Sequence, residues 1–137
     1  MKVNALDHVN IITDDLAGTA RFFAEMFDLD VHDGPEPLKP EWAQWLYDDA
    51  GRAIFHINAK AMPQAYGRET PAGRVTGAIH HVALNCSGHA GFVERLERNG
   101  IDYRLNELPS VNLRQIFFHE PNGVLLELNF FGEMPVD

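Results

Sequence analysis

The segment Ala5-Leu-Asp-His8-Val-Asn-Ile-Ile12 returns 73 positions later as Ala78-Ile-His-His81-Val-Ala-Leu-Asn85. A second segment, Ala53-Ile-Phe-His56-Ile-Asn58, returns 71 positions later as Val124-Leu-Leu-Glu127-Leu-Asn129. Self-similarity at a nearly fixed spacing indicates a duplicated structural unit. The sequence therefore predicts two modules, residues 1–59 and 78–137. A linker rich in glycine and proline joins them over residues 60–77.

Both modules predict the same order of elements, β-α-β-β-β. In the first module, alternating apolar residues predict strands over 6–12, 29–32, 42–47 and 53–58 and a helix over 16–27 that Asp14 or Asp15 caps. In the second module, the same signals predict strands over 78–85, 101–105, 112–118 and 124–130. A helix over about 89–99 stops at Gly100.

The first and fourth strands of each module carry an ionisable residue at an equivalent position. Side chains alternate across a strand, so one face of each strand is purely apolar and the other holds this residue. The four residues are His8, His56, His81 and Glu127. Burying three imidazoles and a carboxylate is costly without a partner, and these groups are ligands of divalent first-row metals. The joint pattern predicts a metal site.

Composition limits the other classes of function. The chain has 137 residues, 45% of them hydrophobic, and a formal charge of 11 − 20 = −9, which disfavours binding to a nucleic-acid backbone. A single cysteine, Cys86, excludes an internal disulfide and a thiolate zinc cluster. The sequence begins without a signal-peptide pattern and has no stretch of about 20 apolar residues, so we expect a cytoplasmic protein that does not interact with membranes.

The order and spacing of these motifs, from Leu6-Asp-His8-Val to Glu120-Pro-Asn-Gly-Val-Leu-Leu-Glu127-Leu, resemble the vicinal oxygen chelate superfamily. Its members include glyoxalase I, extradiol dioxygenases, methylmalonyl-CoA epimerase and the fosfomycin and bleomycin resistance proteins. The resemblance implies a single α+β domain over residues 1–137, in which two βαβββ modules form an open, curled mixed sheet, the glyoxalase-like cup.

The resemblance also implies a cofactor and its ligands. One divalent metal ion (Fe, Zn, Ni or Mn) would be held by His8, His81 and Glu127. His56 would be the fourth ligand, or would form a hydrogen bond to a water on the metal. The first and fourth strands of each module, which supply the ligands in the family, are the strands singled out above by periodicity.

Three functions follow as expectations. The favoured one is a metal-dependent enzyme that acts on a small substrate through two vicinal oxygens, as a glyoxalase-like lyase or isomerase with Glu127 or His56 as the base. The first alternative is an extradiol-type Fe(II) dioxygenase. A two-histidine, one-carboxylate set favours it, whereas Phe117 and Phe118 stand where those enzymes typically have a tyrosine. The second alternative is a metal-free protein that binds a drug or metabolite.

Further residues are expected to contact the substrate or to be structural. Three asparagines each lie two residues beyond a candidate ligand: Asn10, Asn58 and Asn129. The third strands of the two modules carry Trp45, Arg114 and Gln115. We expect these six residues to contact the substrate. His32 and His89 are expected at solvated element ends, and Cys86 as a small buried filler. We expect a homodimer, because short sheets leave edges and apolar surface to cover. The substrate, the metal and any exchange of modules between chains stay open.

Overall fold

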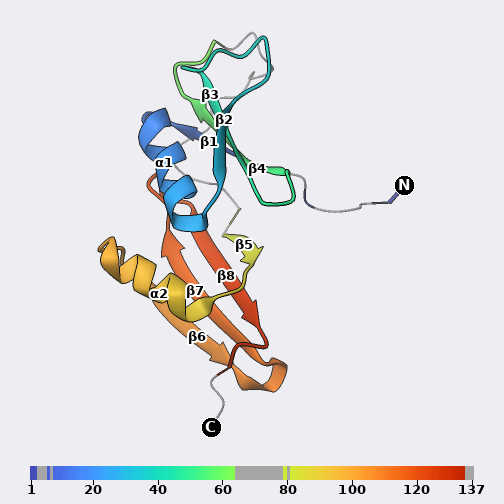
Figure 1. Ribbon diagram of the computed structural model, residues 1–137, viewed down its shortest axis with the longest axis vertical. Helices are drawn as coiled ribbons and strands as arrows, with labels where there is room; N and C mark the ends of the chain where they lie inside the picture. Colours follow the sequence, from blue (N-terminus) through green and yellow to red (C-terminus); the bar gives the residue numbers. More distant parts are fainter. Residues whose placement is uncertain (3–5, 7, 64–78, 80, 135–137) are drawn as a thin grey trace. The chain divides into compact units, whose positions relative to one another are not determined.

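The computed structural model of the protein describes residues 1–2, 6, 8–63, 79 and 81–134 (Figure 1). The chain divides into two compact units, Met1–Ala72 and Gly73–Asp137. Among the described residues, each unit contains one four-stranded mixed sheet and one α-helix. The α+β class and the repeated βαβββ order are therefore confirmed. Most of the predicted linker, residues 64–77, lies outside the described part of the chain.

The first unit follows the predicted order closely. Its elements are β1 (Val9–Thr13), α1 (Leu16–Phe27), β2 (Asp30–Asp33), β3 (Ala43–Tyr47) and β4 (Ala53–Ala59). The sheet order is β1-β4-β3-β2, in which β1 runs parallel to β4 and the other pairs are antiparallel. Helix α1 has the predicted bounds, because Asp15 caps its start by accepting a hydrogen bond from the Gly18 amide at 2.9 Å.

Helix α1 covers one face of this sheet. Phe23 is fully buried, and its ring centroid lies 4.4 Å from that of Phe55 on β4. Met26, Leu46 and Ile57 complete the same core. Because β-strand side chains alternate, this packing commits the odd-numbered side chains of β4 to the helix side, so His56 lies on the other face.

The second unit repeats the arrangement with β5 (Val82–Asn85), α2 (His89–Arg98), β6 (Arg104–Leu108), a short 3-10 helix (Pro109–Val111), β7 (Leu113–His119) and β8 (Leu125–Phe131). The sheet order is β5-β8-β7-β6, with β5 parallel to β8. Phe92 of α2 packs on Phe118 of β7, with ring centroids 5.8 Å apart.

Three predicted strands were placed three or four residues too early. The sequence predicted strands over 6–12, 78–85 and 101–105, but β1 begins at Val9, β5 at Val82 and β6 at Arg104. The residues after α2 instead close the helix: Gly100 takes a left-handed φ of 63°, and the Ile101 amide donates to the Leu96 carbonyl at 3.0 Å. This is the glycine-dependent helix ending expected at Gly100, and it also uses Ile101, which the apolar pattern assigned to the strand.

The expectation that His89 is solvated is wrong. Its side chain is only 3% exposed and packs edge-on against Phe130, with ring centroids 5.1 Å apart. The Glu133 carboxylate caps α2 by accepting from the backbone amides of Gly88 at 2.9 Å and His89 at 2.8 Å. Burial lowers the pKa of His89, and the two backbone hydrogen bonds lower the pKa of Glu133. The cap comes from a residue 44 positions away, so no local pattern announces it.

The turn that aligns β7 with β8 is held by a buried carboxylate. Glu120 is 2% exposed. Its Oε1 accepts from the backbone amides of Asn122 at 2.7 Å and Val124 at 2.9 Å, and its Oε2 accepts from Asn122 Nδ2 at 2.9 Å. This turn sets the register in which Glu127 lies opposite Phe117.

Replacing Glu120 with alanine should therefore lower the free energy of unfolding by about 2–3 kcal/mol, because it leaves shielded backbone amides without an acceptor. Urea denaturation followed by circular dichroism measures this. Glu94→Ala, at an exposed position of α2, is the control and should stay within about 0.5 kcal/mol of the wild type. Equal losses in the two variants would show that the turn does not depend on this carboxylate.

Candidate metal and substrate site

In the second unit, a histidine and a glutamate meet on the sheet face opposite α2. Strand β5 pairs with β8 in a register that sets Ala83 beside Glu127, and His81 precedes Ala83 by two residues on the same face. The His81 Nε2 atom lies 3.2 Å from Glu127 Oε2. The Glu127 side chain is only 13% exposed and that of His81 is 38% exposed. The pair is therefore largely shielded on the carboxylate side and accessible at the imidazole.

The other oxygen of Glu127 is held by a row of hydrogen-bonded side-chain amides that crosses the sheet. Gln115 Nε2 donates to Glu127 Oε1 at 2.8 Å and to Asn129 Oδ1 at 2.9 Å. Gln115 Oε1 in turn accepts from Asn106 Nδ2 at 2.7 Å. The side-chain amides of Gln115 and Asn129, which were expected to contact the substrate, thus form hydrogen bonds to other side chains of the protein.

In the first unit, three aromatic rings stack on the face opposite α1. Trp45 of β3 is opposite His56 of β4 in the sheet register, and their rings are nearly parallel, 4° apart, with centroids 3.8 Å apart. His8 stacks on the other side of His56, also at 3.8 Å and with an angle of 14° between the rings. His56 is therefore enclosed between two rings.

The two pairs differ in how well they fit a metal ion. Two ligand atoms each about 2.1 Å from one ion, at angles of 90–109°, lie about 3.0–3.4 Å apart. The 3.2 Å between His81 Nε2 and Glu127 Oε2 fits this range. Imidazole lone pairs lie in the ring plane, so the nearly parallel rings of His8 and His56 do not direct both lone pairs at one point.

The remaining expected site residues are dispersed. Asn10 is exposed beside His56 in the β1–β4 register, whereas Asn58 is 5% exposed. Arg114 does not share a face with Gln115, contrary to expectation, because adjacent strand residues point to opposite sides. The Arg114 guanidinium instead contacts Glu107 Oε1 at 3.1 Å.

Sequence reasoning missed two features of the candidate faces. Arg104 lies opposite Phe117 in the β6–β7 register, with its guanidinium 4.9 Å from the ring centroid, on the Glu127 face. A hollow of 470 Å³ in the first unit is lined by Asp30, His32, Tyr47, Asp48, Asp49 and Gly51. His32 shares the face of Trp45. Both features depend on cross-strand register, which the sequence alone did not define.

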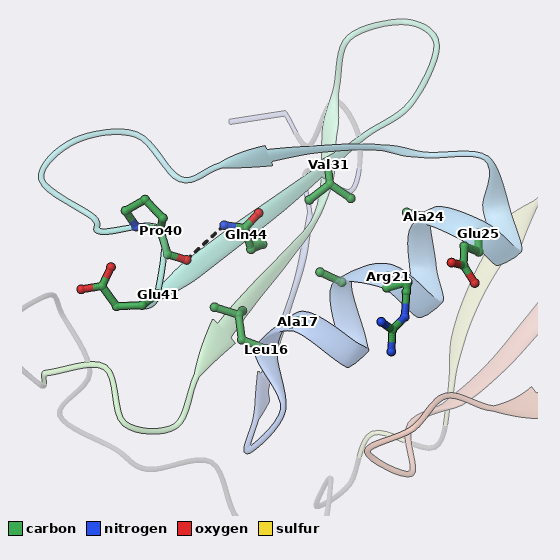
Figure 2. A pocket seen from close by; sticks show the side chains of 10 residues that line it. Leu16, Ala17, Arg21, Ala24, Glu25, Val31, Pro40, Glu41 and Gln44 are labelled. Atoms are coloured by element: carbon green, nitrogen blue, oxygen red, sulfur yellow. Dashed lines mark hydrogen bonds between the residues drawn. The ribbon is translucent and has the colours of Figure 1, made fainter.

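A larger pocket of 660 Å³ lies on the opposite side of the first sheet, against α1 (Figure 2). The small residues Ala17, Ala20 and Ala24 of α1 leave space beside Val31 of β2. Figure 2 shows the Gln44 amide donating to the Pro40 carbonyl, at 3.0 Å, at one end of the pocket. Gln44 precedes Trp45 and therefore faces away from the histidines. The pocket is thus separate from the aromatic column.

Comparison with known proteins identifies the class. Residues 5–128 match the model of the Glyoxalase/Bleomycin resistance protein/Dioxygenase superfamily, and the chain belongs to this superfamily. An Arabidopsis thaliana protein described as Glyoxylase I 4 is 25% identical over 139 residues, which cover 99% of this chain and 76% of that protein.

Solved structures share the fold. Lactoylglutathione lyase from Agrobacterium tumefaciens is 16% identical with a TM-score of 0.69, covering 95% of this chain and 96% of that one. The genomically encoded fosfomycin resistance protein from Listeria monocytogenes is 17% identical with a TM-score of 0.64, covering 96% and 97%. The resemblance read from the sequence is thereby confirmed at the level of family and fold.

The described residues contain no group of three or more His, Cys, Asp or Glu side chains that could hold a metal ion. In the same part of the chain, neither helix has the length and apolarity needed to cross a membrane.

Cys86 is a free, half-buried cysteine that directly follows β5. Burial raises the pKa of its thiol to about 11, and the nearby Glu133 carboxylate adds to the shift. The thiol is therefore protonated at neutral pH and is a poor nucleophile and ligand.

We expect Cys86 in the folded protein to react with a disulfide reagent at pH 8 roughly 100-fold more slowly than in the guanidinium-unfolded chain, because its thiolate fraction is much smaller. The rate should increase steadily from pH 8 to pH 10. Absorbance of the released thiol measures it. Rapid, pH-independent labelling of the folded protein would contradict the burial of this group.

Proposed function

We propose that this protein is a metal-dependent enzyme that acts on a small substrate through two vicinal oxygens, with the chemistry of a glyoxalase-like lyase or isomerase. The observation that carries the proposal is the His81–Glu127 pair, whose ligand atoms are 3.2 Å apart and whose carboxylate is held in place by Gln115. Membership of a superfamily that includes such enzymes supports it.

The proposed ligands are His8, His81 and Glu127. When bound, a divalent ion supplies Lewis-acid stabilisation of negative charge on two adjacent substrate oxygens. The set provides one negative charge, so a divalent ion would keep a net positive charge and attract anionic oxygens. The proposal does not depend on whether the two modules that share an ion come from one chain or from two copies.

The stacked rings of Trp45, His56 and His8 support a different role for His56. Because its ring is parallel to that of His8, we propose His8 as the ligand and His56 as the base that accepts the substrate proton. Glu127 is less suited to this role, since one oxygen accepts from Gln115 and the other faces His81. Trp45 holds the His56 ring and offers an aromatic wall to the substrate.

An extradiol-type Fe(II) dioxygenase is the second candidate. With His56 outside the ligand set, two histidines and one carboxylate remain, which suits non-haem iron. Against it, Phe117 faces the same side as Glu127 and is covered by Arg104, where those enzymes typically have a tyrosine.

Elemental analysis of protein purified without added metal tests the proposal. Zinc or nickel near one ion per chain favours the lyase or isomerase, and iron favours the dioxygenase. A metal content near zero, together with no binding of added Zn²⁺, would refute a metal-dependent enzyme. It would instead favour a protein that sequesters a drug or metabolite.

We expect Glu127→Gln and His81→Ala to abolish metal retention while leaving the circular dichroism spectrum nearly unchanged. Glu127→Gln removes the only negative charge of the proposed set, and His81→Ala removes a ligand atom. His56→Ala should retain most of the metal. The matched control is His119→Ala, at an exposed position of β7, which should retain all of it. Full metal occupancy in Glu127→Gln would refute this ligand set.

We also propose a homodimer. Three large apolar residues near the end of β6, in the 3-10 helix and at the end of β8 are 40–56% exposed: Leu108, Val111 and Phe131. Such clusters on a soluble surface often mark an interface.

Light scattering at micromolar concentration should give about twice the 15.4 kDa chain mass. The double variant Leu108→Asp with Val111→Asp should shift this towards one chain mass, since burying two carboxylates disfavours association. A wild-type particle of one chain mass would contradict the dimer.

A further inference from the structure

We propose that Gln115 is a positioning residue that restricts Glu127 to binding a metal ion through Oε2 alone. The inference rests on the proposed function and adds a specific role that the sequence did not assign. A carboxylate that binds through both oxygens occupies two coordination positions, whereas one that binds through a single oxygen occupies one. Holding Oε1 away from the ion therefore keeps an additional position for a substrate that must bind through two oxygens.

The orientation of the Gln115 amide follows from its partners. Its Oε1 accepts a hydrogen bond from Asn106 Nδ2 at 2.7 Å, so its NH₂ group must point towards Glu127. That NH₂ group donates to Glu127 Oε1 at 2.8 Å and to Asn129 Oδ1 at 2.9 Å. A flipped amide would place two oxygens against each other and would break all three contacts. The network thus selects one orientation of the amide and one oxygen of the carboxylate.

The surroundings make this restraint rigid. Gln115 is only 8% exposed. It lies on β7, an inner strand of the sheet that pairs with both β6 and β8. Shielding from water makes the loss of a hydrogen bond to an ionised group more costly than at the surface. The other oxygen of Glu127, Oε2, does not contact Gln115 and lies 3.2 Å from His81 Nε2.

The first module has no such amide at the position equivalent to Gln115. Gln115 is opposite Asn129 in the second sheet, and Ala43 is opposite Asn58 in the first. Ala43 has no hydrogen-bonding side chain, and the first module has a histidine, His56, where the second has Glu127. The amide therefore occurs in the second module, where Glu127 has two alternative oxygens. It is absent from the first module, where stacking fixes the His56 ring.

Gln115→Met tests the inference, because it keeps the length of the side chain and removes the hydrogen bonds. The matched control is Gln44→Met, on β3 of the first module, whose amide bonds to Asp33 and Pro40 on the α1 side. Zn²⁺ is the probe. We expect its dissociation constant to rise about 10- to 100-fold in Gln115→Met and to stay unchanged in Gln44→Met.

A second readout reports the binding mode directly. Infrared difference spectra recorded on adding Zn²⁺ should show widely separated carboxylate stretching bands in the wild type, as for one bound oxygen. In Gln115→Met these bands should move closer together, as for two bound oxygens. Asn106→Leu, at an exposed edge position, leaves Gln115 in place but releases its amide, and should shift both readouts in the same direction by a smaller amount.

The outcomes separate this inference from the proposed function. If the wild type binds Zn²⁺ through Glu127 but Gln115→Met and Asn106→Leu match Gln44→Met in both readouts, Gln115 has no positioning role and only this inference fails. If Glu127→Gln binds Zn²⁺ as tightly as the wild type, or the wild type binds none, the metal site itself is wrong and both fail.

Discussion

Parallel pairing of the first and fourth strands is the constraint on which the candidate site depends. In each unit the helix and two antiparallel strands lie between these strands in the sequence, yet the strands become neighbours: β1 beside β4 and β5 beside β8. Because the helix buries one face, every side chain on the opposite face is presented together. Residues 46 or 48 positions apart, such as His81 and Glu127 or His8 and His56, are thereby brought within contact distance.

The two modules use this common frame with different chemistry. In the second, a ladder of amides fixes a carboxylate through hydrogen bonds, which define the direction of each oxygen. In the first, stacking between Trp45 and His8 fixes the plane of the His56 ring. Hydrogen bonds fix the position of single atoms, whereas stacking fixes the plane of a ring. The duplicated frame therefore holds a hydrogen-bonded carboxylate in one unit and a stacked imidazole in the other.

The sequence-based prediction was wrong where a side chain distant in the sequence caps or covers an element, or where a helix ending extends into the residues assigned to the next strand. The bounds of α1 were predicted because its cap, Asp15, is local. The environment of His89 was not, because Glu133 caps α2 from the end of the chain and Phe130 covers the ring. The start of β6 was misplaced because Gly100 and Ile101 complete the helix ending before the strand begins.

The sequence by itself determined the repeat, the βαβββ order and the residues that share a face in the first and fourth strands, because side-chain alternation and turn chemistry act over a few positions. It placed His8, His56, His81 and Glu127 at equivalent positions for that reason. The resemblance of its motifs indicated the family. Only the tertiary structure decided which atoms meet: that Gln115 faces Glu127 and Arg114 faces Glu107, and that His56 lies between two rings. These depend on cross-strand register and on side-chain packing between elements, which a one-dimensional pattern does not specify.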